Sequence, residues 1–424
     1  MPDVIVSTLP TPDQDRLWRQ LMELAEFREP GQPGFTRRLF SEPYQRSRAW
    51  VREQMEAVGL VVHADPLGNL IGELAGDQPE LPQIVVGSHT DTVAGGGRFD
   101  GMVGVLGAIE VARLLHQGGS RLRHSLLVVD FLGEEPNRFG LSCLGSRAVT
   151  DQLSPTFLRL RDEDGQTLSA ALSEAGSRPE ELSQGVWPTE RLHSYLELHI
   201  EQGSALERAG IPFGVVTAIA GIHRAVITVT GRPDHAGTTA MSDRRDALAA
   251  CAEAVLLVEQ LARESRKDGS GVGTVGRLEI SPGAANVVPG SATAWVEFRS
   301  SEQAWLQDRH IGLEDGVFGM AARRGVEATV EWVSAEPPIA SSQGVRQLIR
   351  EVVQELGYPL LELSSGASHD AAHVAGRCPM GMIFIPSQDG RSHCPEEWTA
   401  PSEVALGVTA LLAAVLRLDR RDSI

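Results

Sequence analysis

Histidine and acidic side chains follow several apolar segments of the sequence, at the point where each segment ends. The segments and side chains are 83–88 with His89 and Asp91, 125–132 with Glu134 and Glu135, 195–200 with His199, and 380–385 with His393. Such short, continuous apolar segments are typical of strands in a parallel sheet. Because ligands of open α/β sheets bind at the carboxyl ends of the strands, we expect these side chains to share one site.

The residue types predict a metal site. Histidine and carboxylate ligands without thiolate are typical of zinc, manganese, cobalt or nickel. Three histidines and two carboxylates exceed what one catalytic ion needs, so they predict two divalent ions if one carboxylate bridges them. Asp100, which opens a predicted helix over 102–116, is the best candidate for the bridge, because it lies between His89 and the two glutamates in the chain.

The adjacent residues Glu134 and Glu135 are predicted to have two different roles, metal ligand and general base. Their side chains diverge in extended chain, so one can bind metal while the other acts as general base on the attacking water. Asp91 can orient His89. Each residue alone also has an ordinary explanation as a solvated pair, a turn or a structural histidine, and only the joint placement favours a metal site. Cys394, next to His393, is an alternative ligand.

The order of the predicted elements indicates two domains. Apolar strands alternate with helices in the first half of the chain, which is typical of an α/β fold with a doubly wound, mainly parallel sheet. A second pattern then follows, with strands at 225–230, 274–280 and 292–298 and helices at 244–266 and 302–324. It predicts a smaller α+β layer. We therefore expect a catalytic domain over 1–213 and 329–424, with an inserted lid domain over 214–328.

The composition excludes several partners and compartments. The chain has 424 residues, with 38 Lys and Arg against 56 Asp and Glu, a net charge of −18. Such a surface repels nucleic acid and anionic lipid, so we expect neither as a partner. Four cysteines without CxxC spacing and the absence of a signal-peptide pattern favour the cytoplasm. The apolar run Val404–Leu416 is shorter than the roughly 20 residues of a membrane span and predicts a buried helix.

Seven motifs follow one another along most of the chain: GSHTDTVAGGGRFDG (87–101), GEEPNRF (133–139), ELHIEQG (197–203), GRPDHAGTTAM (231–241), NVVPG (286–290), SGASHDA (365–371) and RSHCPEE (391–397). With them the sequence resembles the amidase/carbamoylase branch of the dinuclear-metal aminoacylase and dipeptidase superfamily. That branch includes N-carbamoyl-L-amino-acid hydrolases, allantoate amidohydrolases and β-ureidopropionases. The resemblance implies a homodimer formed through the lid domain, with some substrate residues lent by the partner subunit.

The resemblance also implies roles for individual residues. The implied metal ligands are His89, Asp100, Glu135, His199 and His393, with Asp100 bridging; Glu134 is the general base and Asp91 the partner of His89. The implied substrate residues are Gln202 at the ureido group, His235, Asn286 and Arg299 on the lid, and the loop Gly366–Asp370, with Gly366, Ser368 and His369, near the substrate carboxylate. His235 and Asn286 can donate hydrogen bonds to the oxyanion, and the guanidinium of Arg299 fits a carboxylate.

The expected function is hydrolysis of the linear C–N amide bond of an N-carbamoyl amino acid or a close ureido acid, with metal-bound hydroxide as nucleophile. Two alternatives are an N-acyl-amino-acid amidohydrolase or dipeptidase with the same metals, and a non-catalytic metal-bound binding protein. Three positions depart from the family pattern, which usually has glycine at Pro136, proline at Ala240 and often glycine at Ser368. These departures affect the prediction of the substrate and not that of the metal centre, because every implied metal ligand is present.

Overall fold

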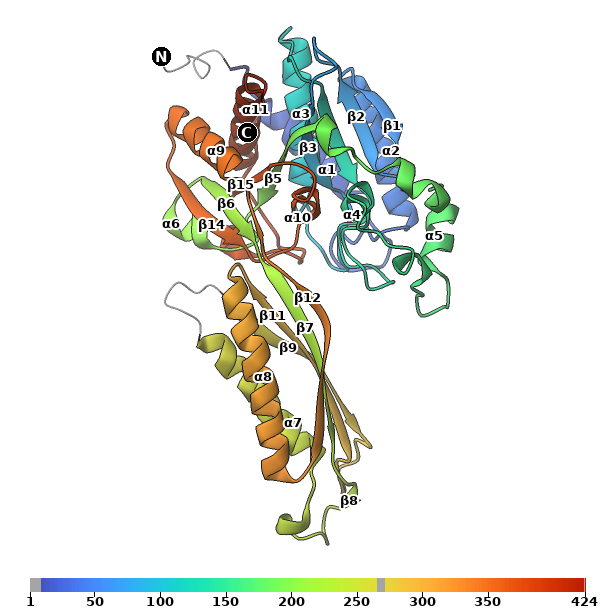
Figure 1. Ribbon diagram of the computed structural model, residues 1–424. Helices are drawn as coiled ribbons and strands as arrows, with labels where there is room; N and C mark the ends of the chain where they lie inside the picture. The colour runs from blue at the N-terminus through green and yellow to red at the C-terminus, as the bar shows by residue number, and fades with distance from the viewer. Residues whose placement is uncertain (1–8, 265–270, 423) are drawn as a thin grey trace. The chain divides into compact units, whose positions relative to one another are not determined.

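The computed structural model describes residues 9–264, 271–422 and 424. These residues form two compact units (Figure 1). The first runs to Thr217 and takes in Ser341–Leu363 and Ser368–Ile424, and the second is Ala218–Ala340 with Ser364–Ala367. The second unit extends past residue 328, where the sequence places its end, because β12 (Glu327–Glu336) belongs to its sheet.

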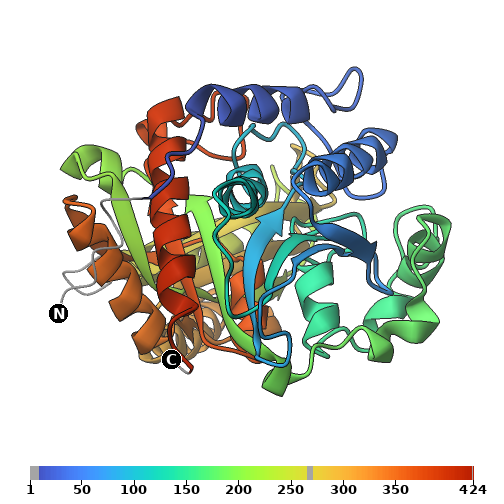
Figure 2. The same cartoon turned by 90° about the horizontal axis from the view of Figure 1, so that it is seen from above.

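The first unit is built on a sheet with four parallel central strands. These are β4 (Leu126–Phe131), β3 (Gln83–His89), β5 (Leu192–Ile200) and β15 (Met380–Ile385), in that spatial order. Almost every residue of these strands is buried, since helices line both faces of the sheet (Figure 2). This confirms the predicted α/β class with a mainly parallel central sheet.

Shorter strands extend the sheet on both sides. The strands β1 (Val61–Ala64) and β2 (Leu70–Leu74) continue it antiparallel beyond β4. On the other side β6 (Phe213–Ile219) pairs antiparallel with β15, and β13 (Ile339–Ala340) and β14 (Leu360–Ser365) pair with β6. The four parallel strands therefore lie inside the sheet, where their carboxyl ends are adjacent.

Helices complete the core of the first unit. They are α1 (Gln14–Ala25), α2 (Glu42–Ala57), α3 (Met102–Gln117), α4 (Leu144–Val149), α5 (Leu168–Glu174), α6 (Ala205–Ala209), α9 (Gln343–Glu355), α10 (Asp370–Val374) and α11 (Pro401–Leu418). Asp13 and Ser41 cap α1 and α2, because each side chain accepts a backbone N–H of the first turn. The apolar faces of α1, α3 and α11 pack on the strands in one core.

The helix α11 is longer than the sequence analysis assumed. The run Val404–Leu416 is part of an 18-residue helix, and within the described residues it is the one helix long and apolar enough to cross a membrane. The length argument against a span is therefore wrong. The predicted burial is confirmed, because Val408, Leu411 and Val415 are fully buried in the core of the first unit.

The second unit is an antiparallel sheet in the order β12, β7 (Gly221–Thr230), β11 (Ser291–Ser300) and β9 (Gly271–Ser281). The helices α7 (Ala247–Arg263) and α8 (Gln303–Arg324) share a core with this sheet. Every second residue of β11 is buried, as expected for a sheet with one covered face. A short pair, β8 (Asp234–His235) and β10 (Val287–Val288), extends from it. This confirms the predicted α+β layer, to which β12 is an addition.

Candidate metal centre and substrate residues

The carboxylate of Asp100 lies between two sets of side chains. Its Oδ1 is 3.0 Å from His199 Nε2 and 3.6 Å from His89 Nε2. Its Oδ2 is 3.0 Å from His393 Nε2, which in turn is 3.4 Å from Glu135 Oε1. Two groups close enough to hold an ion therefore share this one carboxylate, as a bridging ligand requires.

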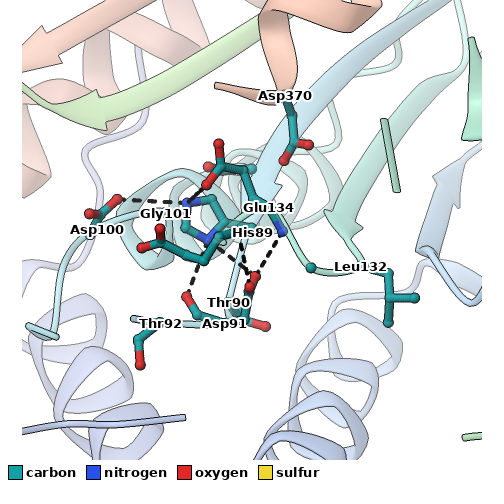
Figure 3. A network of polar contacts seen from close by, with 12 residues as sticks. His89, Thr90, Asp91, Thr92, Asp100, Gly101, Leu132, Glu134 and Asp370 are labelled. Carbon is teal, nitrogen blue, oxygen red and sulfur yellow. Dashed lines mark hydrogen bonds and ion pairs between the residues drawn. The ribbon is translucent and has the colours of Figure 1, made fainter. Parts of the chain in front are cut away.

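Hydrogen bonds orient two of these histidines. His89 Nδ1 lies 3.2 Å from the carbonyl oxygen of Asp91, and His199 Nδ1 lies 2.8 Å from that of Ile200 (Figure 3 shows His89). A carbonyl can only accept, so Nδ1 carries the proton in each ring. Each Nε2 is then the unprotonated nitrogen that can bind a metal, and that of His199 accepts the backbone N–H of Gly101 at 3.1 Å.

The carboxylate of Asp91 ties His89 to the two glutamates. Its Oδ1 is 3.4 Å from His89 Nδ1, and its two oxygens accept the backbone N–H groups of Glu134 and Glu135, each at 3.1 Å. Glu134 Oε2 points toward His89 Nε2 at 3.8 Å, whereas Glu135 faces His393. The adjacent glutamates thus diverge as expected, with Glu135 in a candidate ligand group and Glu134 beside the centre.

Negative charge accumulates in this centre. Burial raises the pKa of Glu134 to about 8, with the charges of Asp370, Asp91 and Asp100 acting in the same direction. Burial, Asp100 and Glu134 together raise the pKa of Glu135 well above its usual value. Buried carboxylates in such number require compensating positive charge, and divalent ions would supply it. The donor set therefore fits the predicted metals.

The backbone is unusual at the same place. Of six non-glycine residues with positive φ among those described, two are predicted site residues: Gln202 and His393. Gly101 also has a positive φ, and a Cβ there would lie 2.5 Å from His89 Nε2, so only glycine fits. Such conformations persist where surrounding contacts hold them and concentrate at functional sites.

A third group of candidate ligands belongs to the same centre. Glu197, His199 and His369 lie close together. Both oxygens of Glu197 are occupied, because Ser88 and Tyr195 donate to them at 2.7 and 3.0 Å. We therefore assign no separate ion to this group. Cys394, the alternative ligand, is in none of the groups found among the described residues.

The predicted substrate residues of the first unit surround the centre in different ways. Gln202 Nε2 donates to Asp100 Oδ2 at 2.7 Å, and Gln202 Oε1 is buried without a partner among the described residues. The ring of His369 packs edge-on against His199 at 4.6 Å, and burial lowers its pKa well below the usual value. Ser368 Oγ contacts Cys143 Sγ at 3.9 Å. Gln202 thus offers a free acceptor, whereas His369 supports a candidate ligand.

The predicted substrate residues of the second unit form two separate pairs. His235 and Asn286 are neighbours, because β8 pairs with β10 and Ala236 N–H donates to the Asn286 carbonyl at 2.9 Å. Arg299 donates to the carbonyl of Gly366 at 3.1 Å and to Glu297 Oε1 at 2.6 Å. The first pair precedes the start of β11 and Arg299 lies near its end, roughly 25 Å along the strand.

Sequence reasoning missed residues that hold Asp100 in place. Glu397 Oε1 accepts the backbone N–H groups of Phe99 and Asp100 at 2.8 and 3.1 Å, and its Oε2 accepts from Ser392 at 2.7 Å. Ser392 also donates to Asp100 Oδ2 at 3.1 Å. The available signal was an acidic residue four positions after His393.

Comparison with known proteins identifies the family. The sequence profile of Peptidase family M20/M25/M40 matches residues 85–417. The chain belongs to this family. It is 39% identical to an N-carbamoyl-L-amino acid amidohydrolase of Geobacillus stearothermophilus, over 95% of this chain and 98% of the relative. It is 33% identical to an allantoate amidohydrolase of Bacillus subtilis, over 93% and 95%.

A solved structure shows the same fold. It is an amidase of the hydantoinase/carbamoylase family from Burkholderia multivorans, 34% identical, with a TM-score of 0.87 over 98% of this M20 chain and 99% of that one. The resemblance stated from the motifs is thereby confirmed, and with it the prediction of a hydrolase of this type. Enzymes of the M20 family are typically dinuclear and metal-dependent, and the groups around Asp100 are candidate metal-binding clusters of this chain.

Proposed function

We propose that the chain hydrolyses the carbamoyl C–N bond of an N-carbamoyl-L-amino acid or a close ureido acid. The observation that carries this proposal is the Asp100 carboxylate shared by two ligand groups, with Glu134 beside it. The amidohydrolase relatives, named for N-carbamoyl amino acids and allantoate, support the substrate class. The free Gln202 Oε1 supports it further, because a ureido group carries N–H donors.

The chain's own residues divide the work. His89, Asp100, Glu135, His199 and His393 would hold two divalent ions, zinc, manganese, cobalt or nickel, which would activate water and polarise the carbonyl. Glu134 takes the proton of the attacking water and passes it to the leaving amino nitrogen. The carbon–nitrogen bond breaks, the amino acid leaves, and the carbamate decays to ammonia and carbon dioxide. His235 and Asn286 donate to the oxyanion, and Arg299 binds the substrate carboxylate.

The test is ammonia release from the purified protein loaded with manganese or zinc. The panel holds N-carbamoyl-L- and D-amino acids, N-carbamoyl-β-alanine, allantoate and N-acetyl amino acids, with amine release followed for the acetyl compounds. Ammonia from one ureido class confirms the reaction and names the substrate. Amine from acetyl compounds alone moves the protein to the acylase reaction. Silence on the whole panel contradicts the proposal.

We also propose that the active enzyme is a homodimer in which the partner subunit supplies His235 and Asn286. The support lies within the second unit, where this pair and Arg299 are too far apart to meet one small substrate. The edge strand β9 exposes Leu278 and Ile280 and leaves one edge unpaired among the described strands, as a pairing surface would.

Mixing two inactive variants tests the shared site. Glu134→Gln lacks the base and His235→Ala lacks the oxyanion donor, so each pure protein is expected to be inactive. Unfolding and refolding them together forms mixed dimers in which one site has both residues. Activity should return to about a quarter of the wild-type value. No recovery, with dimers formed, contradicts the shared site.

A further inference from the structure

The thiol of Cys143 contacts one oxygen of the Glu134 carboxylate, and His89 lies near the other. Cys143 Sγ donates to Glu134 Oε1 at 3.3 Å, whereas Glu134 Oε2 is 3.8 Å from His89 Nε2. Cys143 is fully buried. The two carboxylate oxygens therefore have different surroundings: the thiol donates to Oε1, and Oε2 faces His89.

The backbone holds Cys143 against Glu134. Residues 143–145 lie alongside 132–134, because the N–H groups of Cys143, Leu144 and Gly145 donate to the carbonyls of Glu134, Gly133 and Leu132 at 2.8 to 2.9 Å. Cys143 itself has φ 56° and ψ 41°, a left-handed conformation that is uncommon for residues other than glycine. These hydrogen bonds hold Cys143 in a backbone conformation that usually favours glycine.

We propose that Cys143 is a positioning residue that fixes the plane of the Glu134 carboxylate. This rests on the proposed role of Glu134 as general base. The terminal torsion of a glutamate is broad and roughly two-fold, so a donor on one oxygen decides which way the other points. With Oε1 held by the thiol, Oε2 is directed toward His89 and the metal ligands.

The chemistry of the thiol fits this role. Burial, with Glu134 and Asp370 nearby, raises the pKa of Cys143 well above its usual value, so the sulfur keeps its proton and remains a donor. A thiol is a weak donor, so its loss should slow the reaction without abolishing it. Among the described residues, Ser368 Oγ is a second polar neighbour of Sγ, at 3.9 Å.

The test compares Cys143→Ala and Cys143→Ser with Cys378→Ala. Cys378 is a buried thiol of the same unit whose Sγ has no hydrogen bond to a site residue among the described ones. In Cys143→Ala we expect kcat to fall by about tenfold, a part of what a general base contributes, with KM and metal content unchanged. Cys143→Ser keeps a donor and should stay within about threefold of the wild type. Cys378→Ala should keep its kcat.

The outcomes separate this proposal from the function it rests on. Wild-type kcat in Cys143→Ala, or equal losses in the alanine and serine variants, overturns the positioning role. Loss of metal in Cys143→Ala also overturns it, because the effect would then be structural; thermal unfolding of each variant checks that it folds. If Glu134→Gln retains full activity, the base assignment itself is wrong. If Glu134→Gln is inactive and Cys143→Ala is not impaired, only the positioning role fails.

Discussion

The candidate metal centre and the proposed substrate residues of the second unit are built in opposite ways. Asp100, Glu134 and Glu135 are each about 5% exposed and touch several partners. His235 and Asn286 are exposed, and the strand β11 separates them from Arg299. A buried group of carboxylates must be compensated within its own unit, because an unpaired buried charge is unstable. The exposed pair His235 and Asn286 needs no such compensation, so it can act on a site of the partner subunit, as proposed above.

The largest effect on activity and metal content is expected at Asp100, the carboxylate shared by the two ligand groups. In Asp100→Asn we expect activity to fall below detection and both ions to be lost, because the amide cannot bridge two cations as a carboxylate does. Metal content measured by mass spectrometry after gel filtration checks this. The matched variant Asp234→Asn changes an acidic residue of the second unit and should retain both ions. Full metal content in Asp100→Asn would contradict the bridging role.

Glu134 separates the base from the ligands. Glu134→Gln should lower kcat by about a thousandfold, the scale of general base catalysis, while both ions stay bound. Steady-state kinetics and metal analysis of the same preparation check this. If the ions are lost with the activity, Glu134 is a ligand and the division of labour between the two glutamates is wrong.

A smaller effect is expected at Arg299. Arg224 and Arg299 both pair with Glu297, at 2.7 and 2.6 Å, but Arg299 alone is assigned to the substrate. Arg299→Lys should raise KM about 10- to 100-fold, because lysine cannot offer two parallel hydrogen bonds to a carboxylate. Arg224→Lys, the matched control, should leave KM within about twofold. Equal effects in the two variants would indicate a role for the ion pairs in folding.

The sequence predicts the parallel strands well and the antiparallel ones less well. The strand β15 has the predicted bounds, because a continuous apolar segment is the direct consequence of burial on both faces. The strand β12 was missed, since its partly buried apolar residues alternate with exposed residues that include two glutamates and a threonine. Alternation gives a weaker signal than a continuous segment.

The candidate site shows the same contrast. Strand-end placement predicted a shared metal site, and the family resemblance implied its ligands, His89, Asp100, Glu135, His199 and His393. Their roles stay proposals, but the structure brings them together. Glu397 and Cys143 were not predicted, because their contacts depend on the path of loops. The sequence offers one weak signal for Glu397, its position four residues after His393, and none for Cys143.

The smallest predicted effect is on the pH dependence of stability, and it concerns the histidines at the two ends of β5. His199 is near the carboxyl end of β5 among carboxylates, whereas His193 is near its start, where its Nε2 lies 2.9 Å from the carbonyl of Arg421 and its ring packs edge-on against His124. Burial lowers the pKa of His193 below its usual value. The stability from keeping it neutral is therefore present above about pH 6.5 and is lost as the pH falls through the folded-state pKa, because the unfolded chain then binds the proton more readily.

Replacement of this histidine should flatten the pH dependence. Urea unfolding at pH 7 and pH 5 should show a loss of stability in the wild type that is smaller in His193→Gln, because glutamine does not titrate. The exposed His63 on β1 is the control, and His63→Gln should change with pH as the wild type does. An unchanged slope in His193→Gln would mean that the neutral ring contributes nothing, and that a histidine at the start of the strand is tolerated in either charge state. A flattened slope would show that burial keeps His193 neutral at the start of β5, away from the carboxylates that surround His199 at the other end.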